Sequence, residues 1–261
     1  MRSPGPIEDA SAEAILLAGG ARAILLQLAN PGVAHGVAEH SDFAARPLDR
    51  LHGTLTYLYV TQYGTPDEVR RIARQVGRAH APVRGEGYDA RDVALQVWVA
   101  ATIHDTAIRV HELVFGALSD QDAQVALDSM AIVATTLGVP RAEWPATPAD
   151  FADYWQRAEA ELVVNDAARA VARELLYLRS GALWMRALMP AVRLVTAGLL
   201  SSALREAYAL PFNARRYARL VRLTRAIYPR LPLWLRHYPK RHYLARFRRS
   251  RPSTLSQLAR G

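Results

Sequence analysis

Along most of the chain, apolar residues recur every three or four positions, which is the spacing of one face of an α-helix. No stretch between turn signals alternates convincingly with the period of two that marks a half-buried strand. The pattern therefore predicts an all-α protein. Helices are predicted over residues 11–31, 47–64, 65–82, 89–116, 119–140, 147–162, 167–179, 182–202 and 213–228.

Two of these helices begin with the same sequence device. Thr65 and Thr147 are each followed by a proline and, three positions on, by an acidic residue. Such a threonine caps the helix, proline at the first helical position loses no hydrogen bond, and the acid bonds back to the cap. The sequence therefore predicts helices that start directly after Thr65 and Thr147.

The chain shows no internal repeat, no low-complexity linker and no clean break in composition. We therefore predict a single domain over residues 1–261. Its last segment, residues 229–261, is interrupted by Pro232 and Pro239, and its aromatic residues suggest that it packs back on the domain. These aromatic residues are Trp234, Tyr238, Tyr243 and Phe247.

The absence of cysteine excludes disulfides, zinc–thiolate sites, cysteine nucleophiles and covalent c-type haem. It fits a cytoplasmic protein. The most apolar late run, "LWMRALMPAVRLVTAGLL", contains Arg186, Pro190 and Arg193, which suits a membrane-spanning helix poorly. We therefore expect a cytoplasmic location, with peripheral attachment to a membrane as the alternative.

The net charge of +9 is unevenly distributed: residues 1–181 carry 16 basic and 23 acidic residues (−7), and residues 182–261 carry 17 and 1 (+16). A surface of solvated helices is one interpretation of the basic part. An anionic partner is the other. No recognition motif predicts specific binding of nucleic acid, so weak association with anionic membranes is the partner that we expect.

One histidine lies where an apolar residue is expected. In "VRRIARQVGRAHAPVRG", Val69, Ile72, Ala73 and Val76 form an apolar stripe, and His80 continues it. A core histidine satisfied by a single hydrogen bond explains this position. A neutral imidazole that serves as metal ligand or catalytic base is the alternative.

Arg50, Thr54 and Tyr57 share one face of the helix predicted over residues 47–64. This polar stripe is either ordinary surface or the wall of a polar pocket, in which Arg50 binds a carboxylate with its planar guanidinium.

Polar residues also occur in the long apolar helix predicted over residues 89–116. His104 and His111 lie seven residues apart on one face, and Asp105 and Arg109 are spaced to form an ion pair. The pair either holds helices in register or belongs to a polar site. The zinc-protease H-E-x-x-H motif, the paired E-x-x-H motif of di-iron bundles and the phosphate-binding loop are all missing.

Several ordered stretches together resemble a known family. They are "LLQLANPGVAHGVAEHSDF", "RLHGTLTYLYVTQYGTPDE", "VGRAHAPVRG", "VWVAATIHDTAIRVHE" and "LGVPRAEWPATPADFADYW". The chain is similar to the MpaB/rubber-oxygenase (latex clearing protein) catalytic-domain family. The resemblance implies an all-α fold, related to globins, that encloses a non-covalent haem b. Rubber-cleaving members use O2 to cut the double bonds of polyisoprene, and MpaB-type members cleave a prenyl side chain.

The resemblance also implies roles for single residues. His80 matches the proximal iron ligand, and Arg50 and Thr54 match a pair near the haem, with Tyr57 on the same helix face. His104 and Asp105 are further candidate catalytic residues. Gly53 stands where rubber oxygenases carry a lysine next to the threonine, and Asn30 stands where members often have histidine.

The resemblance therefore implies a haem-dependent oxygenase that acts with O2 on a small apolar, isoprenoid-like substrate. Two alternatives stay open: a haem-binding sensor or carrier without catalytic activity, and a cofactor-free module that binds anionic surfaces through residues 182–261.

Overall fold

The computed structural model of the chain describes residues 7–34, 47–85, 88–178 and 183–250, apart from the side chains of residues 7–9 and 47–50. Its elements are the helices α1 (Gly20–Ala29), α3 (Pro47–Tyr63), α4 (Pro66–His80), α5 (Val93–Phe115), α6 (Asp120–Thr136), α7 (Pro148–Ala160), α8 (Asp166–Leu176), α9 (Leu183–Leu199), α10 (Ser202–Ala207), α11 (Ala214–Ile227), α12 (Leu233–Arg236) and α13 (Tyr238–Arg249), the 3-10 helices η1 (Ile7–Ala12), η2 (Ala14–Gly19), η3 (Arg141–Glu143) and η4 (Tyr228–Arg230), and the strands β1 (Arg84–Gly85) and β2 (Tyr88–Asp89). The prediction of an all-α fold is confirmed.

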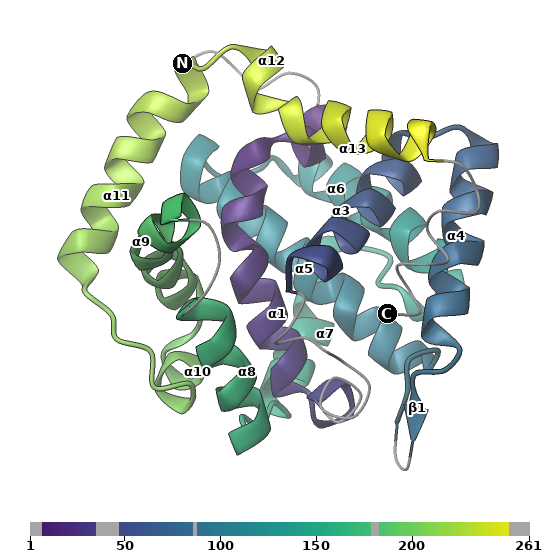
Figure 1. Ribbon diagram of the computed structural model, residues 1–261, viewed down its shortest axis with the longest axis horizontal. Coiled ribbons are helices and arrows are strands. Elements are labelled where there is room, and N and C mark those ends of the chain that lie inside the picture. Colours follow the sequence, from purple (N-terminus) through teal and green to yellow (C-terminus); the bar gives the residue numbers. More distant parts are fainter. Residues whose placement is uncertain (1–6, 35–46, 86–87, 179–182, 251–261) are drawn as a thin grey trace.

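Helix α5 runs through the middle of the molecule (Figure 1), where α1, α6, α11 and η2 pack against it. Its residues Ala101 and Val110 are both buried, and their spacing of nine residues places them on opposite sides of the helix. A helix that is apolar nearly all round belongs in the core, so the sequence pattern predicted this position. The helix begins at Val93, later than expected, because the Asp92 side chain caps it by accepting a hydrogen bond from the Leu95 amide at 3.0 Å.

The first segment differs from the continuous helix expected over residues 11–31. It forms η1 and η2 and becomes α-helical only from Gly20. The reason lies in tertiary contacts: Gly19 is buried directly against Thr106 and Val110 of α5, and the buried Glu13 carboxylate bonds to Arg236. These contacts fix a path that helix propensity alone does not dictate.

The capped helix starts are confirmed. The Thr65 hydroxyl accepts a hydrogen bond from the Glu68 amide at 3.3 Å, and the Glu68 carboxylate accepts one from the Thr65 amide at 2.8 Å. Thr147 and Asp150 form the same reciprocal pair at the start of α7. Helices α4 and α7 therefore begin where the sequence placed them.

A small antiparallel hairpin, β1–β2, follows α4 and was not predicted. Arg84 pairs with Asp89 and Gly85 pairs with Tyr88. Two residues per strand are too few for an alternating pattern to appear in the sequence.

Of the tail predicted over residues 229–261, residues 251–261 lie outside the described part of the chain, and the rest is only partly as expected. Tyr243 and Phe247 are buried, and α13 packs along α3 at the top of the view in Figure 1. Trp234 and Tyr238, however, are exposed, so the prediction that they pack on the domain was wrong. Arg236, rather than these aromatic residues, fixes α12 to the body through its buried ion pair with Glu13.

The apolar runs in the described parts of the chain form no helix that combines the length and the hydrophobicity needed to cross a membrane.

Candidate functional site

The turn between α3 and α4 sets the position of His80. The Thr65 capping box fixes the first turn of α4, and the helix then runs without interruption to His80, its last residue. Along its inward side Ile72 is buried, and Val76 packs against the main core. His80 is half-buried. The apolar stripe therefore leads the imidazole to the edge of the core rather than into its centre.

The polar stripe of α3 divides into two parts. Tyr57 is buried and its hydroxyl donates a hydrogen bond to the carbonyl of Val133 in α6, while burial raises its pKa above the usual value. Thr61, one turn further along, is also buried. Thr54, in contrast, is exposed. The structure thus places Tyr57 and Thr54 in different surroundings. Arg50 belongs to α3 one turn before Thr54, but its side chain lies outside the described residues.

The face of α3 that holds the buried Tyr57 and Thr61 is exposed at Thr54, nearer the start of the helix. The inward stripe of α4 is buried at Ile72 and only half-buried at His80. A Cβ atom added at Gly53 of α3 or at Gly77 of α4 would meet no atom within 4 Å. In Figure 1 the two helices meet at their shared turn and spread apart toward these ends. Both glycines are exposed, so each marks a point on the helix surface that no described neighbour covers.

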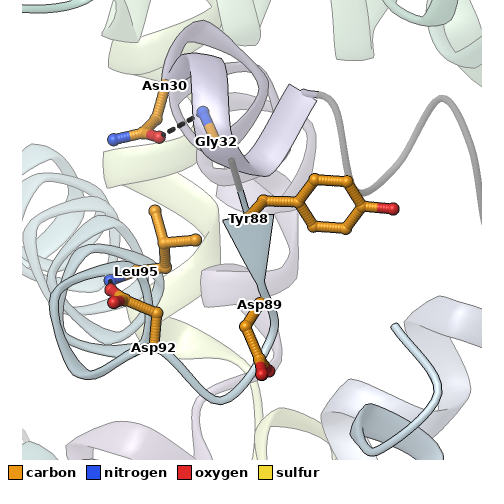
Figure 2. Close-up of a pocket in the computed structure, with 6 residues that line it drawn as sticks. All are labelled: Asn30, Gly32, Tyr88, Asp89, Asp92 and Leu95. Atoms are coloured by element: carbon orange, nitrogen blue, oxygen red, sulfur yellow. Dashed lines mark hydrogen bonds between the residues drawn. The ribbon is translucent and has the colours of Figure 1, made fainter. Parts of the chain in front are cut away.

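A hollow of about 400 Å³ lies where the end of α1, the hairpin and the start of α5 meet, and Figure 2 shows its lining residues. The hairpin begins four residues after His80, so the hollow follows α4 directly in the chain. Its volume falls within the range of small-molecule pockets. Its lining residues are Asn30, Gly32, Tyr88, Asp89, Asp92 and Leu95.

The polar groups of this hollow already have partners. The Asn30 side chain accepts hydrogen bonds from the amides of Gly32 and Val33 at 3.0 and 3.3 Å. Hydrogen bonds from Arg91 lower the pKa of Asp89 to about 2, so its carboxylate is ionised and paired. The side chains of Asn30 and Asp89 are therefore engaged in local hydrogen bonds and are poorly placed to transfer protons.

The region from the first helices to η4 matches one family model, described as "ER-bound oxygenase mpaB/B'/Rubber oxygenase, catalytic domain", over residues 8–228. The chain belongs to this family. The resemblance of the sequence motifs is thereby confirmed, and the family is described as one of oxygenase catalytic domains. The match includes α3, α4 and α5, and it ends before α12 and α13.

Two curated relatives of the chain are uncharacterized proteins of Mycobacterium bovis and Mycobacterium tuberculosis. Each is 35% identical over 143 residues, which cover 51% of this chain and 56% of the relative. The chain thus spans about half the length of the curated relatives that it matches. No solved structure matches the chain.

The mpaB/rubber oxygenase match also covers His104 and Asp105 on α5. His104 is buried with its ring edge-on to Phe151 at 4.7 Å and to Trp144 at 6.3 Å between centroids. Burial lowers its pKa to about 4, so the imidazole is neutral at physiological pH. Asp105 forms the expected ion pair with Arg109 at 2.8 Å and a second one with Arg22 at 2.6 Å.

Arg22 is a buried charged residue that the sequence did not single out. Besides Asp105, its guanidinium donates to the Thr106 hydroxyl at 2.7 Å and to the Leu199 carbonyl at 2.8 Å. This network joins α1, α5 and the end of α9. The only signal in the sequence is one arginine within the apolar run "GARAILLQLA".

Among the residues that the structure describes, no three histidine, aspartate or glutamate side chains gather into a possible metal site. A haem iron needs only one protein ligand on its proximal side, which a single imidazole supplies. His80, at the end of α4, offers one such imidazole.

Proposed function

We propose that the chain is a haem-dependent oxygenase that acts on an apolar substrate, with His80 as the proximal ligand of a non-covalent haem b. The observation that carries the proposal is the position of His80, half-buried at the end of the inward stripe of α4. The exposed surface at Gly53 of α3 supports it, because a flat macrocycle needs a surface free of side chains and no described neighbour covers this position. Membership of an oxygenase family supports the reaction class.

The residues of α3 and α4 have distinct parts in this proposal. The imidazole of His80 offers a nitrogen ligand at a fixed place, because the capped helix determines where α4 ends. Thr54 offers a hydroxyl at the uncovered part of α3, and Arg50, one turn earlier, would bind a haem propionate. Gly53 leaves no lysine amine at its position. When bound, the haem would supply the activation of O2.

Two further predicted residues take part less directly. Tyr57 supports α3 through its bond to the Val133 carbonyl, and it holds the helix rather than the cofactor. The contacts of Asp105 with Arg22 and of His104 with Phe151 favour structural roles on α5. A catalytic role for His104 and Asp105 stays a prediction.

The family description names rubber oxygenase, so prenyl compounds are the substrates to test first. Full-length protein reconstituted with haemin should consume O2 when a polyprenyl compound is added. Haem binding without O2 consumption would instead favour a sensor or carrier. Failure to bind haem would contradict the proposal and leave a cofactor-free module.

Arg50→Ala tests the role of α3, with His52→Ala as its matched control. His52 lies two residues further on, and its ring is 5.9 Å from that of Tyr243 in α13. We expect Arg50→Ala to weaken haem retention and O2 consumption more than His52→Ala does. Equal effects of the two substitutions would show that this helix face does not contact the cofactor.

A further inference from the structure

Helix α12 reverses the usual distribution of apolar and charged residues. Leu233, Trp234 and Leu235 are 53%, 61% and 42% exposed, whereas the next residue, Arg236, is buried at 6%. A four-residue helix that holds three large apolar side chains in water and one charge in the interior requires a physical reason.

The reason is the ion pair between Arg236 and Glu13, which holds the inner side of α12 against the domain. The Arg236 guanidinium donates to the buried Glu13 carboxylate, with its Nε 3.0 Å from Oε2, and the Tyr228 hydroxyl donates to the same oxygen at 2.7 Å. Turning α12 over would leave the buried Glu13 carboxylate without its arginine partner, which is strongly unfavourable. Arg241 also donates to the Trp234 carbonyl at 2.6 Å. The apolar side chains are therefore held outward.

The end of α11 extends this apolar surface. Leu223 and Ile227 lie four residues apart on one side of the helix and are 57% and 51% exposed. Figure 1 shows the end of α11 and α12 at the same corner of the molecule, joined by η4. We call this surface the α11–α12 face. It consists of Leu223, Ile227, Leu233, Trp234 and Leu235.

Exposed arginines flank the α11–α12 face, and this part of the sequence contains no acidic residue. Arg219 and Arg222 are exposed on α11, and Arg230 and Arg241 are exposed next to α12. No aspartate or glutamate occurs in the sequence after Glu206. The face thus combines aliphatic and tryptophan side chains with positive charge that no nearby acid in the sequence neutralises.

We propose that the α11–α12 face docks onto anionic lipid bilayers. Leucine, isoleucine and tryptophan side chains enter the boundary between headgroups and acyl chains, and arginines bind the anionic headgroups around them. A nucleic acid would use the arginines but would leave the aliphatic side chains in water. The combination on this face therefore favours lipid.

This surface is separate from the predicted haem site. Figure 1 shows α12 at the top of the view and the end of α4 lower down on the right, with α13 and α3 between them. Docking therefore does not depend on the proposed cofactor, and substitutions in the α11–α12 face should leave haem binding unchanged.

Vesicle co-sedimentation of the full chain tests the proposal. Vesicles of phosphatidylcholine with 30% phosphatidylserine would be compared with pure phosphatidylcholine, at low and at physiological salt. We expect binding to the anionic vesicles that weakens as salt rises. The same affinity for neutral vesicles, or no binding to anionic vesicles at low salt, would overturn the proposal.

Two variants and their matched controls locate the surface. Leu233→Ser/Trp234→Ser/Leu235→Ser should weaken vesicle binding at least roughly tenfold, because it removes the apolar area that enters the membrane. Val163→Ser, which removes an exposed apolar side chain between α7 and α8, should not. Arg222→Gln/Arg230→Gln should weaken binding about 25-fold, or roughly fivefold per charge. Arg157→Gln/Arg173→Gln removes two exposed arginines of α7 and α8 and should change binding much less.

Light scattering of the wild type tests the remaining alternative, in which the α11–α12 face binds a second copy of the chain. If the wild type is a dimer that the triple serine variant converts to a monomer, the face is a dimer interface and the proposal is wrong. Unchanged vesicle binding of both variants would equally overturn it. Circular dichroism checks that each variant is folded, which we expect because the substituted side chains are exposed.

Discussion

Arg22 is 2% exposed, and its charge has one close acidic partner, Asp105. Burial lowers the pKa of Arg22, and the carboxylate of Asp105 opposes that shift. An arginine stays charged in a protein interior, so the pair is a fixed buried charge contact between α1 and α5. The stability of this contact between α1 and α5 therefore depends on Asp105.

We expect Asp105→Ala to lower the free energy of unfolding by about 3 kcal/mol, because it leaves the buried Arg22 without its counter-charge. The matched control is Asp67→Ala, which breaks the exposed pair with Arg70 and should have little effect. Urea denaturation of both variants measures the difference. Equal stabilities would show that the Arg22 network does not hold the fold.

His104 provides a second prediction at this scale. Burial lowers its pKa to about 4, while in the unfolded chain it titrates near 6.5. Between these values the unfolded state binds a proton that the folded state does not, so stability decreases as pH falls from 6.5 toward 4. The loss attributable to His104 is on the order of 3 kcal/mol.

His104→Phe should remove this part of the pH dependence, since phenylalanine does not titrate and fits a site lined by aromatic rings. Denaturation curves at several pH values between 4 and 7 check this, with the half-buried His242→Phe as control. If wild type and His104→Phe lose stability in parallel over this range, His104 is not the neutral buried group described above.

Among the elements, those with local start signals were predictable from sequence. α4 and α7 begin directly after Thr65 and Thr147 because the cap, the proline and the acid all act within four residues. The first segment was not predictable in the same way. Its 3-10 path depends on the contact of Gly19 with α5, about 90 residues further along the chain, and no local pattern records such a contact.

Gly19→Ala should destabilise the fold by about 1–3 kcal/mol through overpacking. A Cβ atom there would overlap the Thr106 methyl group and lie 3.0 Å from a Val110 methyl group. Thr106 cannot rotate freely, because its hydroxyl accepts a hydrogen bond from Arg22. Gly77→Ala is the control: its Cβ would meet no atom, and alanine favours the helix by about 0.5–1 kcal/mol. Thermal unfolding that shows equal shifts for both variants would contradict this account of the first segment.

In the whole molecule, the basic C-terminal part is held by a few specific contacts. Arg236 pairs with Glu13, and Arg248 pairs with Glu68 at 2.8 Å. Arg71 donates to the Phe247 carbonyl at 3.1 Å and stacks on the Phe247 ring at 4.0 Å. Arginines on the exposed side of α11 have positions that suit an external partner. The charge asymmetry is visible in the sequence, but only the structure distinguishes the arginines that contact the rest of the domain from those that face outward.

The candidate site was predictable to a similar degree. The spacing of Val69, Ile72 and Val76 placed His80 correctly on the inward side of α4. The spacing of Arg50, Thr54 and Tyr57 suggested one polar stripe, yet Tyr57 bonds to Val133, 76 residues away. Such a partner is set by the packing of α3 on α6, which a pattern within one helix does not reveal.

Titration of the full chain with haemin, followed by absorption spectroscopy, tests the central claim most directly. We expect the wild type and His242→Ala, which alters another half-buried histidine, to bind about one haem per chain with the spectrum of an imidazole-ligated iron. His80→Gly should lose this spectrum while staying helical, and added imidazole should restore it. Equal haem content and the same spectrum in His80→Gly without imidazole would contradict the assignment of His80 as the iron ligand.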